Sequence, residues 1–187
     1  AAKVEVAAPS DIVPAGQKEA VQVRVTNIGA GHSIPTGLTE VRNMWLTVYT
    51  VDANGAKTEL DRTEFGTKLV DKNGQEVGAK FWLGAKKKSD VRIKAGETYT
   101  KDIEITMPSD AKAQTIVAEL NYQSARDTDI APSKVKNPTT VMAKDSYSLY
   151  ASEDAKKSND VVKQTPAEDN SNEGVLPAVA VSAIILV

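Results

Sequence analysis

Hydrophobic and polar residues alternate with a period of two through most of residues 3–125. Val21, Val23 and Val25 are separated by polar residues, and similar alternation runs through 45–51, 99–105 and 116–122. Neighbouring side chains of a β-strand point to opposite faces of the sheet, so this pattern predicts strands with one buried face. No long segment has the 3.6-residue period of an amphipathic helix.

Turn-forming residues separate these segments. Asn54-Gly55 and Asn73-Gly74 favour the positive backbone dihedrals of tight hairpins, and Lys94–Glu97 predicts another turn. Short strands divided by such turns are typical of antiparallel sandwiches. The sequence therefore predicts an all-β fold, an immunoglobulin-like antiparallel β-sandwich that occupies residues 1–126.

The pattern changes after Arg126. Residues 127–151 contain two prolines and little alternation, which predicts an extended segment with a short helix near 144–155. Residues 152–174 consist largely of charged and amide side chains with almost nothing to bury, and they predict a flexible polar tether. The sandwich is thus expected to carry an irregular, partly disordered C-terminal extension.

Residues 175–187 form an uncharged apolar segment at the end of the sequence. The segment is shorter than the roughly 20 residues that a helix needs to cross a bilayer. We interpret it as the possible start of a membrane anchor, with Pro177 in the first helical turn. The alternative is a hydrophobic strand that docks on the sandwich or on a neighbouring subunit.

Composition excludes several classes of function. The 23 basic and 25 acidic residues leave a net charge of -2, so the chain lacks the broad cationic face that nucleic acids require. Cysteine is absent, which excludes disulfides, thiol nucleophiles and covalent attachment of haem through a Cys-x-x-Cys-His motif. One histidine and no cysteine also leave no pair for nucleophilic catalysis, so we expect a protein that is not an enzyme.

The first residues bear on localisation. The chain begins Ala1-Ala2-Lys3, as expected after removal of a signal peptide that ends in small residues. A trimmed chain would look the same. We expect an extracytoplasmic protein, either periplasmic or at the cell surface, that is tethered to a membrane through its C-terminus.

The only histidine lies in a loop rich in glycine and turn-forming residues, between two segments with the strand pattern. Besides His32, this loop at 27–37 contains Gly29, Gly31, Pro35, Thr36 and Gly37. So many glycines and turn residues predict that the main chain is held close to another loop or to a bound group. The alternative is a purely structural loop, in which a half-buried imidazole bonds to loop carbonyls or to the Thr36 hydroxyl.

Two sequence blocks carry a resemblance to a known domain. The first is Asn-Ile-Gly-Ala-Gly-His with Pro-Thr-Gly at 27–37, and the second is Asp-Val-Arg-Ile-Lys-Ala-Gly-Glu at 90–97. Together with the Leu-Asn-Tyr strand at 120–122, they resemble the β-sandwich domain that accompanies bacterial and archaeal multihaem c-type cytochromes. The resemblance covers residues 17–125. It departs from the family at Ala95, where proline is usual, and in the absence of haem-attachment motifs.

The resemblance implies a partner and a cofactor. It implies an accessory subunit of an electron-transfer assembly that docks on a multihaem c-type cytochrome and scaffolds or shields its haems. Because this chain has no cysteine, it binds no haem covalently, and any haem c that it contacts belongs to the partner. His32 is the candidate axial ligand or haem contact in trans, because imidazole is the usual ligand of haem iron. Arg42 and Arg92 are candidates for binding haem propionates, or else for pairing with Asp90 or Glu97.

The few large aromatic residues suggest further roles. We expect Trp45, on a central strand, to anchor the core. Trp82-Leu83 before Lys86-Lys87-Lys88 is either a solvated turn or a cationic tip for anionic lipid or an acidic partner. A second class of function stays open: a cell-surface adhesion or filament module of immunoglobulin-like type, without a redox role.

Overall fold

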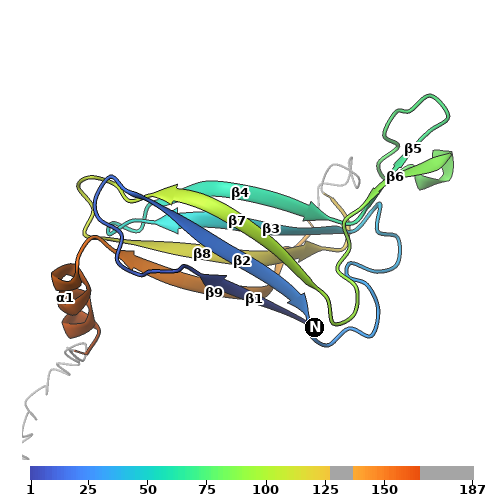
Figure 1. Cartoon of the computed structure of the whole chain (residues 1–187). Helices are drawn as coiled ribbons and strands as arrows, with labels where there is room; N and C mark the ends of the chain where they lie inside the picture. Colours follow the sequence, from blue (N-terminus) through green and yellow to red (C-terminus); the bar gives the residue numbers. More distant parts are fainter. Residues whose placement is uncertain (127–136, 165–187) are drawn as a thin grey trace, which may run out of the picture.

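Two antiparallel sheets pack face to face in the computed structural model, which describes residues 1–126 and 137–164 (Figure 1). The first sheet has the order β1-β2-β7, formed by β1 (Ala2–Ala7), β2 (Lys18–Asn27) and β7 (Thr98–Thr106). The second has the order β4-β3-β8-β9, formed by β3 (Asn43–Val51), β4 (Lys57–Phe65), β8 (Ala113–Gln123) and β9 (Thr140–Tyr150). The predicted immunoglobulin-like β-sandwich is confirmed.

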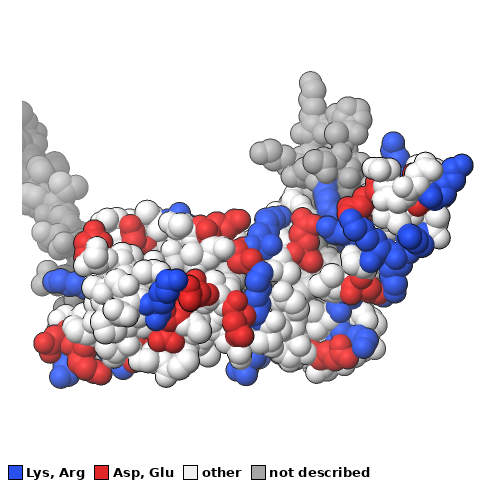
Figure 2. All heavy atoms as spheres, turned by 45° about the horizontal axis from the view of Figure 1, so that its top comes forward, with Lys and Arg blue, Asp and Glu red and all other residues white. Residues whose placement is uncertain are grey.

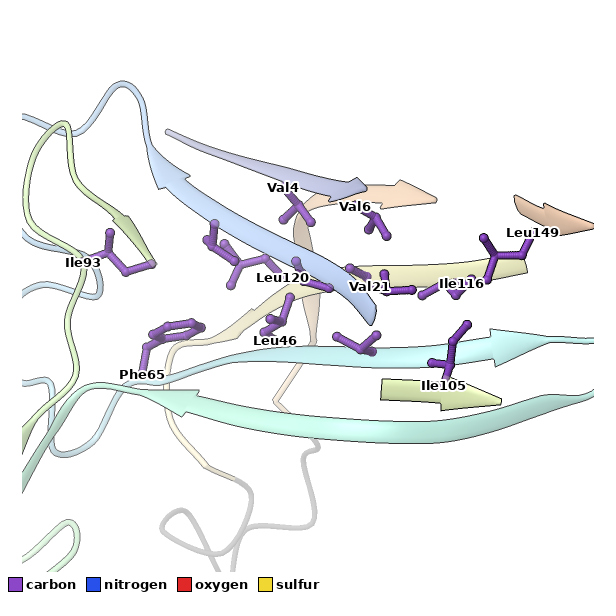
Figure 3. Close-up of a cluster of buried hydrophobic side chains, with 14 of the residues drawn as sticks. Val4, Val6, Val21, Leu46, Phe65, Ile93, Ile105, Ile116, Leu120 and Leu149 are labelled. Atoms are coloured by element: carbon purple, nitrogen blue, oxygen red, sulfur yellow. The ribbon is translucent and has the colours of Figure 1, made fainter. Parts of the chain in front are cut away.

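The alternating valines of β2 fill the space between the sheets. Val21, Val23 and Val25 are almost completely buried, and they meet the inward-facing Leu46 and Leu120 of the second sheet (Figure 3). Phe65 closes one end of this core, where its ring packs edge-on against Tyr99 at 5.1 Å between ring centres. Burial of this apolar layer is what fixes the register of both sheets, because a one-residue slip would expose it.

The prediction that Trp45 anchors the core is wrong, because its side chain points away from the core. Trp45 is buried, at 8% exposure, but the residues of β3 that face the core are Met44, Leu46 and Val48. The indole therefore lies on the outer face of the second sheet, where the Arg62 guanidinium stacks over it at 4.6 Å from the ring centre. The strand pattern misled because β3 is buried on both faces, so it has no clean alternation.

The prediction of an extended segment with a short helix over residues 127–151 is wrong for the second half of that range. Residues 140–150 form the full-length strand β9, which pairs with β8, rather than an extended segment or a helix near 144–155. Asp145 interrupts the strand pattern in the sequence, because it stands among the inward-facing residues Ala143, Tyr147 and Leu149. The sandwich therefore extends beyond residue 126, and residues 127–136 between β8 and β9 lie outside the described part of the chain.

Contacts between the beginning and the end of the described sandwich close it along one side. The backbone N–H of Val6 in β1 donates to Asp145 Oδ2 in β9 at 2.8 Å. Beyond β1, the backbone crosses to the other sheet: Val13 N–H donates to the Tyr150 carbonyl at 2.8 Å, and Tyr150 N–H donates to the Asp11 carbonyl at 2.7 Å. These bonds cover edges that would otherwise present unpaired backbone groups.

A small arm projects from the end of the sandwich where β2 leads into the loop at 28–42 (Figure 1). It consists of β5 (Thr67–Val70) and β6 (Lys86–Asp90), which pair with each other, and the single 3₁₀ turn η1 (Phe81–Leu83). Asn73-Gly74 forms a tight turn within the arm, with Gly74 at φ 84°, as the sequence predicts.

Helix α1 (Glu153–Gln164) follows β9 at the opposite end of the sandwich (Figure 1). The sequence predicts a flexible tether over 152–174. This prediction is wrong for its first half, which forms α1. Ser152 caps the helix, since its hydroxyl accepts from Ala155 N–H at 3.2 Å, and Lys156 pairs with Asp11 at 2.5 Å. The rest of the tether and the apolar segment at 175–187 lie outside the described residues. Within the described residues, no helix combines the length and apolarity that a membrane span requires.

Candidate functional site

Asn27, the last residue of β2, holds together the loop that contains His32. Its amide donates to the His32 carbonyl at 2.8 Å and to the Ile93 carbonyl at 3.2 Å, and its side-chain oxygen accepts from Ala30 N–H at 3.1 Å. Asn27 is only 1% exposed, so these bonds are made away from water. A buried amide with its hydrogen bonds satisfied fixes one loop conformation.

The imidazole of His32 lies on the exposed surface of this loop. Its Nδ1 is 3.1 Å from the Ser33 carbonyl oxygen. A carbonyl only accepts hydrogen bonds, so Nδ1 is the donor, and in the neutral imidazole the lone pair is then on Nε2. The bond to a loop carbonyl agrees with the structural alternative, whereas the half-buried position expected in that alternative is wrong.

The turn residues of the loop have different roles. Ile34 and Ile93 exchange backbone hydrogen bonds at 2.8 and 2.9 Å, which ties the loop to the segment before β7. Pro35 is buried behind a cis peptide bond, and Gly37 has a φ of 74° that favours glycine. Gly29 lies near the first residue: a Cβ there would lie 3.6 Å from Ala1 Cα. Thr36 is exposed.

A shallow hollow of about 430 Å³ lies beside the loop. Its lining is Thr26, Asn27, Ile28, Gly29, Ala30, Gly31 and Gly96. Gly31 has no atom within 4 Å of the place where a Cβ would be, so the space in front of its backbone is open. Ile28 is 62% exposed at the same place. The loop therefore presents small residues, one apolar side chain and an imidazole to any partner.

The two candidate arginines lie at the same end of the sandwich and bind within the chain. Arg92 forms two hydrogen bonds with Asp90, from Nε at 2.8 Å and from Nη2 at 2.6 Å. The Arg92 side chain holds the pKa of the Asp90 carboxyl well below its usual range. Arg42 donates from Nη1 to the Ser124 carbonyl at 3.3 Å. Intramolecular pairing, the second option for Arg92, is therefore observed.

Comparisons with known proteins show the fold. No protein-family model matches the sequence, and no curated protein matches it. Among solved structures, the chain is similar to a penta-haem cytochrome c552 from Thermochromatium tepidum, with a TM-score of 0.60 and 20% identity. The fold resembles part of a multihaem cytochrome. The similarity covers 80% of this chain but 39% of that cytochrome, so the chain spans well under half of its length.

A second solved structure is more distant. Spo0M, a sporulation control protein from Bacillus subtilis, matches with a TM-score of 0.35 and 14% identity, over 80% of this chain and 49% of that one.

Sequence reasoning missed the residue that organises the site. Asn27 belongs to the motif quoted above, but nothing in its type marks it as the buried amide that positions His32. Its place directly after the valine alternation of β2 is the only available signal. In the described parts, 1–126 and 137–164, no three or more side chains of His, Asp or Glu gather in a way that could hold a metal ion.

Proposed function

We propose that this chain is an exported, non-catalytic accessory module that docks on a multihaem c-type cytochrome and shields or positions its haems. The proposal combines the two motif blocks with the likeness to part of a penta-haem cytochrome. The contact surface is the loop at 27–37 with its hollow, and the haem belongs to the partner. The extracytoplasmic location and the membrane tether at the C-terminus are part of the same proposal.

The observation that carries the proposal is the state of His32. The imidazole is exposed, and Nδ1 is engaged by the Ser33 carbonyl, so Nε2 is the nitrogen available to a partner. Histidine ligands of metals commonly donate their other ring N–H to a backbone carbonyl, which fixes the ring and raises its basicity. The small residues beside His32 leave room for the flat face of a porphyrin.

The edges of the sandwich weigh against the adhesion or filament alternative. The outer strand β4 carries a dense series of charged side chains, among them Lys57, Glu59, Asp61, Arg62 and Glu64. Charged edge strands resist addition of another strand. On the other side of the same sheet, β9 is bonded at Tyr150 by the segment at 11–13.

The experiment is co-purification of the tagged full chain from its source under native conditions, followed by haem staining and Soret spectroscopy. We expect a c-type cytochrome in the complex. His32→Ala should then shift the Soret band or the midpoint potential of one haem. A complex that retains its spectrum and potential with His32→Ala would contradict ligation, and the absence of any haem protein would overturn the proposal.

A second variant tests the docking surface without relying on ligation. Gly31→Leu places a side chain in open space and should leave the fold intact while it blocks the partner. Ala56→Leu, in the exposed β3–β4 turn at the other end of the sandwich, is the matched control. Equal capture of the cytochrome by both variants would show that the loop at 27–37 is not the contact surface.

A further inference from the structure

The apex of the arm presents large apolar side chains to solvent. In η1, Trp82 is 68% exposed, Leu83 53% and Phe81 37%. The rings of Phe81 and Trp82 pack edge-on at 5.4 Å between centres. Exposed apolar side chains are common singly, but three in one projecting turn indicate contact with something other than water.

Hydrogen bonds and packing hold this apex in place. Leu83 N–H donates to the Lys80 carbonyl at 2.9 Å, and Gly84 N–H donates to the Phe81 carbonyl at 3.0 Å. A Cβ at Gly84 would lie 2.9 Å from Leu69 Cδ1, so the turn is packed closely against β5. The aromatic side chains therefore extend into solvent from a turn that hydrogen bonds and packing hold in one conformation.

The arm also has a charge opposite to that of the rest of the chain. Residues 67–90 contain six lysines and three acidic residues, a net charge of +3, in a chain whose net charge is -2. Figure 2 shows Lys and Arg gathered around the arm at one end of the molecule, with uncharged atoms between them. Lys88 pairs with Glu76 at 2.7 Å and Lys87 with Asp90 at 3.3 Å. Among the described residues, no ion pair is found for Lys72, Lys80 or Lys86.

We propose that the arm binds an anionic phospholipid surface, with Trp82 and Leu83 inserted at the level of the head groups and the lysines on the lipid phosphates. Tryptophan is enriched at membrane interfaces, because its ring is amphipathic. Juxtamembrane lysines are attracted to anionic leaflets. Both features occur here on a single projecting arm, at the end of the sandwich opposite α1 (Figure 1).

The shape of the apex favours lipid over an acidic protein. Binding energy between proteins concentrates in well-packed pockets that exclude water. The turn η1 exposes its apolar side chains, and lysines surround it on the same arm (Figure 2). A deformable interface with an apolar interior and a charged surface can meet both kinds of group at once, whereas a protein would need a matching socket with an acidic rim.

The two tryptophans make a direct test possible. The chain has only Trp45 and Trp82, and Trp45 is 8% exposed, so a change in emission on binding reports chiefly on Trp82. The full chain is mixed with vesicles of phosphatidylcholine alone, or with about a third phosphatidylglycerol, and followed by fluorescence and co-sedimentation. We expect a blue shift and binding with the anionic vesicles, weakened by about 0.5 M salt.

Matched variants separate insertion from charge. Each lysine near an anionic surface contributes about fivefold in affinity, so Lys72, Lys80 and Lys86 changed together to Gln should weaken binding roughly 100-fold. The same change at Lys3, Lys18 and Lys112, on the sandwich, should have a much smaller effect. Trp82→Ala with Leu83→Ala should abolish insertion, while Val141→Ala, at an exposed position on β9, should not.

Three outcomes would overturn the inference: no binding to anionic vesicles, binding that the arm variants leave unchanged, or binding without a shift in Trp82 emission. Arm variants that instead lose an acidic protein partner, with no vesicle binding by the parent chain, would assign the arm to protein docking. The vesicle assay contains no cytochrome, so its result is independent of the proposed function.

Discussion

The side-chain amide of Asn27 donates a hydrogen bond to the main-chain carbonyl of His32 at 2.8 Å, across five residues of loop. A buried residue at the end of β2 thereby sets the position of an exposed imidazole. The same amide reaches the Ile93 carbonyl, so it joins the His32 loop to the second motif block. Together with the backbone hydrogen bonds between Ile34 and Ile93, this side chain holds the two blocks next to each other.

Replacing Asn27 should loosen the loop and destabilise the fold together. Asn27→Asp keeps an acceptor for Ala30 N–H but loses the donor to the His32 and Ile93 carbonyls. We expect a loss of about 2–3 kcal/mol in the free energy of unfolding, because a charge is buried and two carbonyls lose their donor. Urea unfolding measures this loss, and limited proteolysis should detect new cleavage in the loop. Equal stability of the variant and the parent would show that the amide is not structural.

The direction of Trp45 can be tested with a polar substitution. Leu46→Gln places an amide in the core between the sheets and should cost about 4 kcal/mol or more. Trp45→Gln places the same amide on the outer face, beside polar neighbours, and should cost about 1–3 kcal/mol. Urea unfolding of both variants gives the comparison. A larger loss at Trp45 than at Leu46 would mean that the indole belongs to the core after all.

The contact between β1 and β9 should contribute measurably to stability. Asp145→Ala removes the acceptor of Val6 N–H and should lower the free energy of unfolding by about 1.5–3 kcal/mol. Asp145→Asn retains a neutral acceptor and should lose less. The two unfolding curves are compared, with Ser146→Ala on the outer face of β9 as the control. If Asp145→Ala and Ser146→Ala lowered the free energy of unfolding equally, the hydrogen bond from Val6 would make no specific contribution to stability.

Acid should remove part of the stability of the second sheet. Burial acts to raise the pKa of the Glu119 carboxyl, but hydrogen bonds from Lys144 and Tyr49 outweigh it and hold the pKa below the ordinary value of 4.5. A lowered folded-state pKa stabilises the fold above the unfolded value, and this contribution is lost as the pH falls through the folded value.

The matching variant is Glu119→Gln. We expect it to be about 0.5–1 kcal/mol less stable than the parent chain at neutral pH, and the difference should shrink below about pH 4.5. Urea unfolding across the acid range measures the difference. A gap that stays constant down to low pH would show that the charge of Glu119 makes no contribution.

The parts of the fold that can be predicted from the sequence are the strands that bury one face and expose the other to solvent. In β2, the polar partners of Val21, Val23 and Val25 face solvent or lie half-buried, so the alternation alone locates the strand and its inner face. The tight turns at Gly55 and Gly74 are equally direct, because their positive φ values need a glycine.

The parts that do not follow depend on contacts between distant segments. The inward position of Asp145 makes β9 look polar, and only the bond from Val6 accounts for it. In the arm, β6 begins with three consecutive lysines, although lysine has a low strand propensity, because the strand pairs with β5. At the candidate site, the sequence singles out His32, but it gives no sign that the buried amide of Asn27 holds the loop together.

The bond between Val6 and Asp145 joins residues that are 139 positions apart. During synthesis, β1 emerges long before its neighbour β9, and it must wait for the remainder of the sandwich. Pairings of such long range make folding slow, because the entropy of closing a large loop is lost before the contact forms. Until β9 arrives, the Val6 N–H lacks its acceptor, and the side of the sandwich at β1 is the last to be completed.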